Sequence, residues 1–310
     1  MHNSRVLVTG GAGFIGGRLV DRLIGERHEV AVLDNLFSGK TRNLEEHLSS
    51  TSLHLIRGDV RNSRAVKKAV RGATTVFHLA AVVDVPLSVE NPVLTNDVNV
   101  AGTLSVLDAS LAENVDRFIY ISSCAVYGEA RYLPINEEHP TTPLSPYGVS
   151  KLAAENYCRN YREIHGLKTC CLRLFNVYGL GQHAGSYSGV ISKFVRKVQR
   201  GESPVVYGDG KQTRDFIHVN DIIDACMLAM ESVHVDSGPF NIGTGKPTTI
   251  RELADITIEL WGKTSIKPVY EEPRTGDIEN SYADISKARK TLNFEPRTDL
   301  KNGMKSLIKT

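Results

Sequence analysis

The sequence predicts an α/β protein with a doubly wound parallel sheet and a smaller C-terminal lobe. Three observations predict this fold class. Short β-branched runs alternate with longer helical patterns through the first half of the chain, which is typical of repeated βαβ units. Most of these runs are continuously apolar, as expected for strands that helices cover on both faces. After Phe175 the alternation gives way to longer segments rich in Gly, Ser and Pro, which indicates a second, less regular lobe.

The elements follow from these patterns in chain order. The expected strands are Arg5–Thr9, Glu29–Leu33, Leu53–Arg57, Thr75–Leu79, Arg117–Ser122 and Lys168–Leu174. Helices are expected near 14–26, 62–71, 94–113 and 147–166, and in the lobe near 189–200, 221–232, 250–261 and 286–293. Residues 1–175 are expected to form the first domain and 176–310 the lobe. The segment near 214–235 has the pattern of a strand followed by a helix and is expected to return to the first domain.

Composition excludes several classes of protein. The 310 residues are 41% hydrophobic and 23% charged, as in an ordinary globular enzyme. A net charge of +2 with scattered basic residues predicts no nucleic-acid partner. No apolar run is long enough to span a membrane, and MHNSR leads into VLVTG without a secretion-signal pattern, so a cytoplasmic location is expected. The five cysteines lack CxxC pairing, which predicts reduced thiols, no disulfide framework and no metal site.

A glycine-rich turn lies between the first strand and the first helix. The run GGAGFIG (10–16) places Gly10, Gly13 and Gly16 in a GxxGxxG spacing. Glycines allow a tight turn and a close approach of the backbone to a pyrophosphate, whose charge then meets the helix N-terminus. Because a strand precedes the turn and a helix follows it, the turn predicts a Rossmann-type dinucleotide site.

Acidic residues at the ends of the next two strands fit the same site. Asp34 follows the second strand, where a carboxylate accepts hydrogen bonds from an adenosine ribose and repels a 2′-phosphate. NAD is therefore favoured over NADP. Asp59, after the third strand, is placed to reach the adenine edge, although its spacing fits a helix N-cap equally well.

A Tyr-xxx-Lys pair begins the helix expected at 147–166. Tyr147 and Lys151 lie one turn apart, so their side chains share one face of the helix. A tyrosine with a pKa of about 10 is a poor base at neutral pH. The neighbouring ammonium and a positive nicotinamide ring are expected to lower the pKa of Tyr147. Tyr147 could then take a proton from a sugar hydroxyl while hydride leaves the carbon.

These motifs and others along nearly the whole chain resemble the extended short-chain dehydrogenases/reductases and, within them, the UDP-glucose 4-epimerases. The shared series is GGAGFIG, DNLFSG (34–39), HLAA (78–81), ISSCAVYG (121–128), YGVSK (147–151), LRLFNVYG (172–179), YGDGKQTRDFIHV (207–219) and RTGD (274–277). The resemblance implies that hydride leaves C4 of a UDP-linked hexose, the 4-keto sugar turns over, and hydride returns to its opposite face. The same NAD is then reused.

The resemblance also implies roles for individual residues. Ser123 would share the reacting proton with Tyr147, and Lys151 would also bond the nicotinamide ribose; these three form the expected catalytic set. Besides the glycines and acidic residues above, the residues expected to line NAD are Phe14, Ile15, Asn35, Ser38, Gly39, Val60, Leu79, Ala80 and Ala81, with Asn99 supporting the site. Related dehydratases and decarboxylases carry carboxylates across 123–125. Cys124 and Ala125 stand here instead, which argues against elimination and decarboxylation.

Substrate-binding residues are implied mainly in the C-terminal lobe. Arginine forks suit phosphate oxygens. The residues implied are Arg214, Arg274 and Asn176 for the diphosphate, Asp277 for the nucleoside ribose and Tyr207 for the base. Ser281 stands where a bulky tyrosine restricts this family to plain hexoses, so UDP-GlcNAc and UDP-GalNAc are expected to be accepted as well. The alternative is that Ser281 is a loop serine and another side chain closes the pocket.

Assembly and the choice of sugar are left open by the sequence. The resemblance implies a homodimer. The expected helices have apolar residues at a helical spacing that suits a dimer interface and a core face equally well: Leu94, Val98, Ala101, Leu104, Val149, Leu152 and Ala153. The loop VVDVPLSVENP (82–92) lacks the lysine that simple hexose epimerases carry near its start. Rival functions are a UDP-glucuronate 4-epimerase, a reductase that releases its product after one hydride transfer, and a non-catalytic NAD sensor.

Overall fold

A seven-stranded parallel sheet forms the centre of the protein. The computed structural model describes residues 4–182, 189–234, 236, 238–273 and 276–308. The strand order is β11-β6-β5-β4-β1-β2-β3, and every neighbouring pair is parallel. The strands are β1 (Arg5–Thr9), β2 (Glu29–Asp34), β3 (Leu53–Arg57), β4 (Thr75–His78), β5 (Arg117–Ser123), β6 (Lys168–Leu174) and β11 (Phe240–Ile242). The order reverses between β1 and β4, which is the topology of a doubly wound sheet and confirms the predicted fold class.

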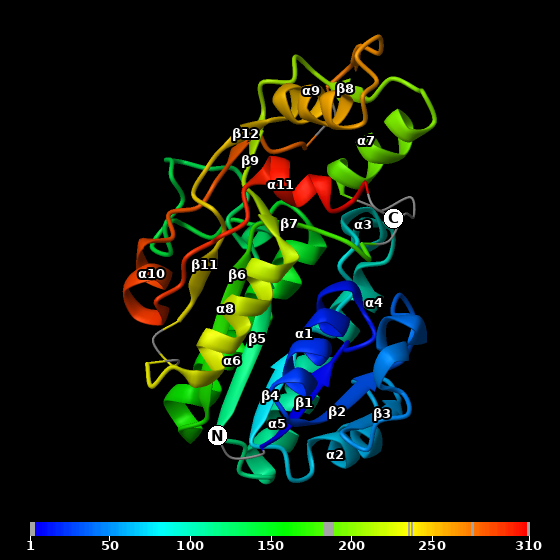
Figure 1. Ribbon diagram of the computed structural model, residues 1–310. Helices are drawn as coiled ribbons and strands as arrows, with labels where there is room; N and C mark the ends of the chain where they lie inside the picture. The colour runs from blue at the N-terminus through cyan, green and yellow to red at the C-terminus, as the bar shows by residue number, and fades with distance from the viewer. Residues whose placement is uncertain (1–3, 183–188, 235, 237, 274–275, 309–310) are drawn as a thin grey trace.

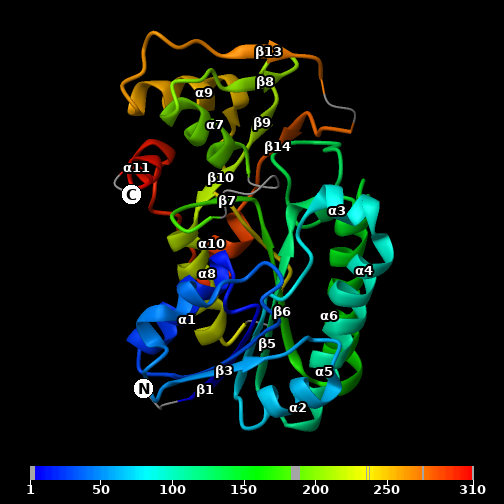
Figure 2. The ribbon, with the colours of Figure 1, turned by 90° about the vertical axis from the view of Figure 1, so that its right-hand side faces the viewer.

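Helices cover both faces of this sheet. On one face lie α1 (Phe14–Gly25) and α8 (Val219–Glu231), and on the other lie α2 (Ser63–Val70), α5 (Gly102–Ala112) and α6 (Pro146–His165) (Figure 1, Figure 2). Alternate residues of each strand therefore enter different cores. Val6 and Val8 belong to the core under α1, whereas Leu7 belongs to the core under α2 and α5. Burial of both faces is the physical reason for the continuously apolar strands.

The chain between β4 and α5 departs from the single helix expected at 94–113. Two short helices, α3 (Val85–Glu90) and α4 (Pro92–Asn96), are N-capped by Asp84 and Asn91. A π-helical turn, η2 (Asp97–Ala101), then leads into α5. A π turn widens the helix locally and rotates the side chains that follow, a feature that apolar periodicity does not reveal.

The rest of the C-terminal half forms a lobe above the central sheet (Figure 1). In the described chain its strands pair as β10-β7, β12-β9-β14 and β13-β8. Its elements are β7 (Asn176–Tyr178), α7 (Val190–Gln199), β8 (Val205–Tyr207), β9 (Thr213–Arg214), β10 (Phe216–His218), β12 (Thr248–Thr249), α9 (Ile250–Leu260), β13 (Val269–Glu271), β14 (Asn280–Ser281) and α11 (Leu300–Lys305). Helix α10 (Ser286–Leu292) lies beside β11 and packs on the core of the central sheet (Figure 1). The first half also contains two short helical turns, η1 (Thr41–His47) and η3 (Cys124–Val126). Across the described ranges, no helix has the length and apolarity that crossing a membrane requires.

Besides α10, two elements of the C-terminal half lie against the first half. Helix α8, within the segment 214–235, packs on α1 and β5. Strand β10 of the same segment pairs with β7 and does not enter the central sheet. The strand that extends the central sheet is β11, which pairs with β6 and was not expected from the sequence. The domain boundary at 175/176 stays a prediction.

Candidate active site

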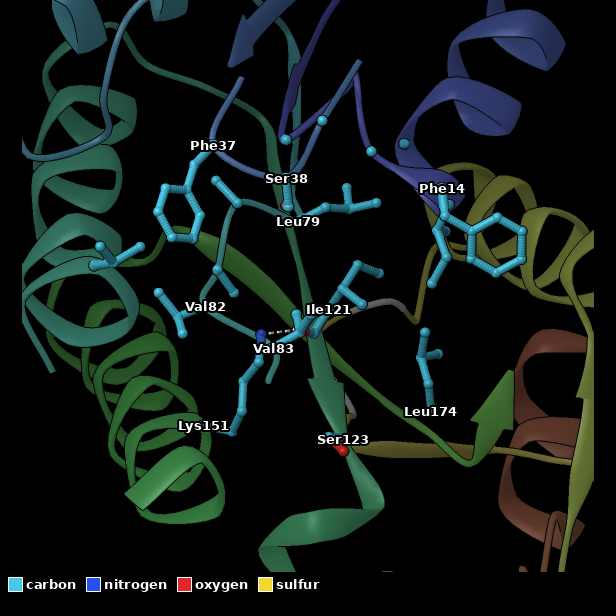
Figure 3. A pocket seen from close by; sticks show the side chains of 18 of the residues that line it. Phe14, Phe37, Ser38, Leu79, Val82, Val83, Ile121, Ser123, Lys151 and Leu174 are labelled. Atoms are coloured by element: carbon cyan, nitrogen blue, oxygen red, sulfur yellow. Dashed lines mark hydrogen bonds between the residues drawn. The ribbon is translucent and has the colours of Figure 1, made fainter. Parts of the chain in front are cut away.

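A cavity of about 470 Å³ lies where the strand order reverses, the usual ligand position in a doubly wound sheet. Figure 3 shows Phe14, Leu79, Ile121 and Lys151 around it, contributed by different elements. The sequence-predicted residues that line this cavity are Gly10, Gly13, Phe14, Ile15, Gly16, Asp34, Asn35, Ser38, Gly39, Val60, Leu79, Ala80, Ala81, Ser123, Tyr147, Lys151 and Asn176. The fold therefore gathers residues from six predicted motifs at one site.

At Gly10 and Gly16, the backbone of the glycine-rich segment lies too close to its neighbours for a larger residue. Gly10 has a φ of +69°, and a Cβ there would lie 2.8 Å from the Ala80 nitrogen. A Cβ on Gly16 would lie 2.2 Å from the Gly10 carbonyl oxygen. Gly13 is the N-cap of α1 and has no side chain to satisfy the first helical N–H groups. Those N–H groups and the positive end of the helix dipole suit a pyrophosphate.

Asp34 joins the end of β2 to this turn. Its Oδ2 accepts a hydrogen bond from the Ala12 N–H at 2.9 Å, and its Oδ1 accepts one from the Leu36 N–H at 2.7 Å. Each carboxylate oxygen has a second lone pair. The fixed carboxylate on the cavity wall can therefore still accept hydrogen bonds from ribose hydroxyls.

Two other predicted cofactor residues do not line the cavity. Asp59 accepts hydrogen bonds from Asn35 Nδ2 and Arg61 Nε, both at 2.8 Å, and the Arg61 guanidinium holds the pKa of this carboxyl well below its usual range. Asn99, in the π turn, is buried behind the wall. It accepts from the Val82 N–H at 2.7 Å and donates to the Val82 carbonyl at 2.9 Å and to Ser150 Oγ at 2.9 Å. Both residues thus hold loops that border the cavity.

The catalytic set is presented by the start of α6 and the end of β5. Ser145 caps the helix through the Gly148 N–H, and Pro146 occupies its first turn, so the helix begins immediately before Tyr147. Tyr147 is 9% exposed and Lys151 2%. Ser123 hydrogen-bonds the Tyr147 side chain.

Lys151 reaches the same strand one turn further along the helix. Its Nζ donates to the Ile121 carbonyl at 2.8 Å (Figure 3). The same nitrogen lies 6.0 Å from the centre of the Tyr147 ring and 4.8 Å from that of Tyr120. The ammonium is thus close to the phenol without bonding it in this arrangement.

Burial has the largest influence on the ionisation of Tyr147 and Lys151. Burial raises the pKa of Tyr147 to about 12, and the hydrogen bond from Ser123 opposes the rise. Burial also lowers the pKa of Lys151 to about 8. In the protein itself, desolvation of the phenolate is the largest influence on the pKa of Tyr147. The lowering expected from the ammonium and the nicotinamide ring together stays a prediction.

The substrate residues predicted in the lobe lie on a different wall. Arg214 Nη2 donates a hydrogen bond to Asp277 Oδ1 at 2.6 Å. Ser281 is buried and lies opposite Arg214 in the β9–β14 strand pair. The Ser281 side chain is hydrogen-bonded to Cys124. Tyr207 ends β8. None of these four predicted residues lines the 470 Å³ cavity. Arg274 lies outside the described residues.

Comparison with known proteins assigns the family. Residues 6–243 match the NAD dependent epimerase/dehydratase family. The chain belongs to this family. The family that its motifs resemble is thereby confirmed.

Relatives of this epimerase/dehydratase protein align over nearly its whole length. UDP-glucose 4-epimerase of Mycolicibacterium smegmatis is 34% identical over 312 residues, which cover 98% of this chain and 97% of the relative. A UDP-N-acetylglucosamine 4-epimerase structure from Methanobrevibacter ruminantium, in complex with UDP-N-acetylmuramic acid, has a TM-score of 0.94 and 38% identity over 100% of this chain and 98% of that one. The UDP-glucose 4-epimerase of Thermus thermophilus in complex with NAD has a TM-score of 0.89 and 36% identity over 98% of each chain.

NAD is the cofactor of this family member, as predicted. The residues present fit it: the uncapped N-terminus of α1 suits the pyrophosphate, Asp34 the ribose and the apolar wall at Leu79 and Ala80 the rings. In the described part of the chain, no group of three or more His, Cys, Asp and Glu side chains could hold a metal ion.

Some cavity residues were not predicted from the sequence. They are Leu33, Phe37, Gly58, Arg61, Val82, Val83, Leu94, Val98, Ile121, Ser122, Cys124, Leu174, Phe175, Val177, Gln182 and Gly189. Phe37 and Cys124 lie inside motifs that had been recognised, so their neighbours in sequence could have identified them. Gln182 and Gly189 belong to no such motif, and only the tertiary fold brings them to the wall.

Proposed function

We propose that this protein is an NAD-dependent UDP-hexose 4-epimerase that interconverts UDP-glucose and UDP-galactose. The observation that carries the proposal is the cluster of Ser123, Tyr147 and Lys151 on the cavity wall, beside Cys124 rather than a carboxylate. A phenol, a hydroxyl and an ammonium supply what oxidation and re-reduction of a carbinol require, namely a group that takes one proton and returns it. Elimination would need a further acid and base in the segment 123–125.

The residues divide the work as follows. Tyr147 takes the proton of the C4 hydroxyl and later returns it. Ser123, which bonds Tyr147, orients the reacting oxygen, and the Lys151 charge stabilises the phenolate. When bound, NAD supplies the capacity to accept a hydride and give it back. The 4-keto sugar turns over between the two transfers, so no net oxidation occurs.

The nucleotide is proposed to bind between the wall of the NAD cavity at Asn176 and the lobe residues around Arg214. Asn176 lies on the cavity wall, and its buried Oδ1 lacks a hydrogen-bond partner among the described residues. Arg214 is held in a fixed orientation by Asp277. A guanidinium already oriented by a carboxylate loses less side-chain entropy when it binds a phosphate. Arg274 and Tyr207 complete the proposed set.

Ser281 is proposed to leave room for a 2-acetamido group, so that UDP-GlcNAc and UDP-GalNAc are also substrates. The residue is buried, and it hydrogen-bonds Cys124, which lies on the cavity wall beside Ser123. We expect Ser281→Tyr to abolish epimerisation of N-acetylated sugars while sparing UDP-galactose, and Ser281→Ala to retain both. Equal turnover of both sugars by Ser281→Tyr would contradict the proposed role of Ser281 in substrate choice.

The first experiment is proton NMR of the anomeric signals. Purified protein is incubated with UDP-galactose and, separately, with UDP-N-acetylgalactosamine, without added NAD. Appearance of both gluco isomers supports a dual-specificity epimerase with retained NAD. If neither sugar changes even with NAD supplied, the proposal fails.

The rival functions give different results in the same experiment. A UDP-glucuronate 4-epimerase would act on the uronic acid alone, and a reductase would consume added NADH in proportion to product. A non-catalytic NAD sensor would bind NAD and change no sugar. The grouping of Tyr147 with Ser123 and Lys151 on the cavity wall serves chemistry rather than binding, which favours an enzyme.

A homodimer in a reducing cytoplasm is proposed as the form of the enzyme. Val93 and Val149, on α4 and α6, are 69% and 54% exposed and lie on adjacent helices. Burial of apolar side chains is the main driving force for such association. Light scattering on the purified protein tests the dimer, and Val149→Asp is expected to yield a monomer. The free thiols of all five cysteines fit a reducing compartment.

A further inference from the structure

Strand β5 and helix α6 are joined through three consecutive strand residues. From strand to helix the pairs are Ser123–Tyr147, Ile121–Lys151 and Ser122–Glu155. The three helix residues follow one another at intervals of one turn and form a row along α6. Two of the pairs involve the proposed catalytic set. The third continues the row with a carboxylate that the proposed reaction does not use.

Glu155 is buried in a polar network. It is 7% exposed, and Arg173 on β6 is 5% exposed. Arg173 Nη2 bonds Glu155 Oε2 at 2.6 Å, and Nε lies 3.0 Å from Oε1. Ser122 Oγ donates to Oε1 as well. Arg173 Nη1 is in turn held by Tyr127 Oη at 2.9 Å.

This network keeps the carboxylate near Lys151 without letting it close onto the ammonium. The arginine fork and Ser122 engage both carboxylate oxygens. Lys151 Nζ therefore keeps its hydrogen bond to the Ile121 carbonyl and stays 6.0 Å from the centre of the Tyr147 ring. An opposite charge held at a short distance favours the charged form of a buried amine without consuming its hydrogen bonds.

We propose that Glu155 is a positioning residue for the reaction: it keeps Lys151 charged and fixes α6 on β5 in the register that sets Tyr147 against Ser123. The inference rests on the proposed catalytic role of Lys151. A purely structural ion pair would not need to lie one turn from that residue. Buried ion pairs are costly to desolvate and can often be replaced by apolar side chains. Stability alone therefore does not explain the Glu155–Arg173 pair.

The surroundings of Lys151 support this role. Burial lowers the pKa of Lys151 to about 8, and Glu155 is the strongest influence that raises it. Within the described residues, the other titratable groups that face Lys151 include no carboxylate. They are Tyr147 and Cys158 on α6, Tyr120 on β5, Cys171 on β6 and His78 on β4.

The test is a direct titration of Lys151 by NMR. The protein is labelled with ¹³C at lysine Cε, and the Lys151 signal is assigned by its absence in Lys151→Arg. We expect Glu155→Gln to lower the pKa of Lys151 by about one unit or more, because the carboxylate is lost while the shape is kept. The alkaline limb of the kcat profile, where turnover falls as Lys151 loses its proton, is expected to move to lower pH by the same amount.

Two further variants separate charge from folding and from hydrogen bonding. Glu155→Gln/Arg173→Met removes both charges, so it carries the test if Glu155→Gln alone does not fold. It is expected to lower the Lys151 pKa less than Glu155→Gln does. Ser122→Ala removes one hydrogen bond and keeps both charges, so its Lys151 titration is expected to match the parent.

An unshifted Lys151 titration in the folded glutamine variants would overturn the proposal. An equal shift in Ser122→Ala would also overturn it, because the effect would then come from packing rather than charge. The titration needs no substrate. Failure of the epimerase assignment would appear as absent sugar turnover in the parent protein and would leave the titration result unaffected.

Discussion

The cofactor half and the lobe build their sites in different ways. In the cofactor half, the backbone at the ends of successive strands forms the wall, as at Gly10 after β1 and Asp34 at the end of β2. In the lobe, Arg214 meets Asp277 across 63 positions of sequence, through the short β9–β14 pair. A site made from local turns depends on a few neighbouring residues, whereas a site made from distant side chains depends on the whole packing of the lobe.

This difference leads to different expected effects of substitution. Changes in the cofactor half should lower kcat or release NAD, because they act on the reacting atoms or on the backbone that approaches NAD. Changes in the lobe should raise KM and leave kcat closer to its original value, because they weaken binding of the nucleotide. Three predictions test this division, from the largest expected effect to the smallest, and a fourth concerns the acid stability of the cofactor half.

Tyr147→Phe should produce the largest loss. Removal of a general acid and base costs about 10²- to 10⁴-fold in rate, so we expect kcat to fall within that range. Bound NAD and the melting temperature should stay near those of the parent, since the ring and its packing are kept. The control is Tyr161→Phe on the same helix, whose phenol bonds Asp108 away from the cavity. Retention of kcat by Tyr147→Phe would contradict the assigned role.

Gly16→Ala should weaken NAD retention. The added Cβ would meet the Gly10 carbonyl oxygen at 2.2 Å, so the turn that approaches the pyrophosphate must shift. Overpacking of this kind costs about 1–3 kcal/mol, or roughly five- to 150-fold in NAD affinity measured by calorimetry on the stripped enzyme. Gly25→Ala, at the other end of α1, meets nothing within 4 Å and serves as the matched control. Equal NAD affinities in Gly16→Ala and Gly25→Ala would show that the close approach of the backbone at Gly16 does not matter for binding NAD.

Arg214→Ala should act on KM. A charge-assisted hydrogen bond contributes about 1.5–3 kcal/mol, so we expect KM for the UDP-sugar to rise about tenfold or more while kcat changes less. Lys211→Ala, on the same segment, removes an exposed ion pair with Asp209 and should leave both constants unchanged. A fall in kcat with an unchanged KM would place Arg214 with the reacting groups instead of with the nucleotide.

His78 should produce the smallest effect, on stability rather than turnover. It is fully buried between Thr9 and Thr103, and burial lowers its pKa to about 3. The unfolded histidine titrates near pH 6.5, so this contribution is complete above that pH and is lost as pH falls from about 6.5 toward 3. The slope is at most about 1.4 kcal/mol per pH unit.

The measurement is the free energy of unfolding between pH 7.5 and pH 5. We expect His78→Gln to reduce the loss of stability on acidification, and His54→Gln, at an exposed site, to leave it as in the parent. An unchanged slope in His78→Gln would mean that this buried histidine does not govern acid stability.

Much of the cofactor half could be predicted because its signals are local. The strands follow from apolar runs, the dinucleotide turn from glycine spacing, and the shared helix face of Tyr147 and Lys151 from one helical turn. The π turn at 97–101 was missed because it keeps helical hydrogen bonding while it shifts the phase of the side chains. Strand β11 was missed because three residues are too few for a pattern.

The sequence by itself determined the fold class, the family and NAD as cofactor, because each depends on periodicity or on motifs of a few residues. The tertiary structure decided what distance in sequence conceals: the return of β11 to the sheet, the Arg214–Asp277 pair, and the row that ends at Glu155. It also decided ionisation, since burial has the largest influence on the pKa of Tyr147. Desolvation depends on every atom packed around a group, and no local motif records that packing.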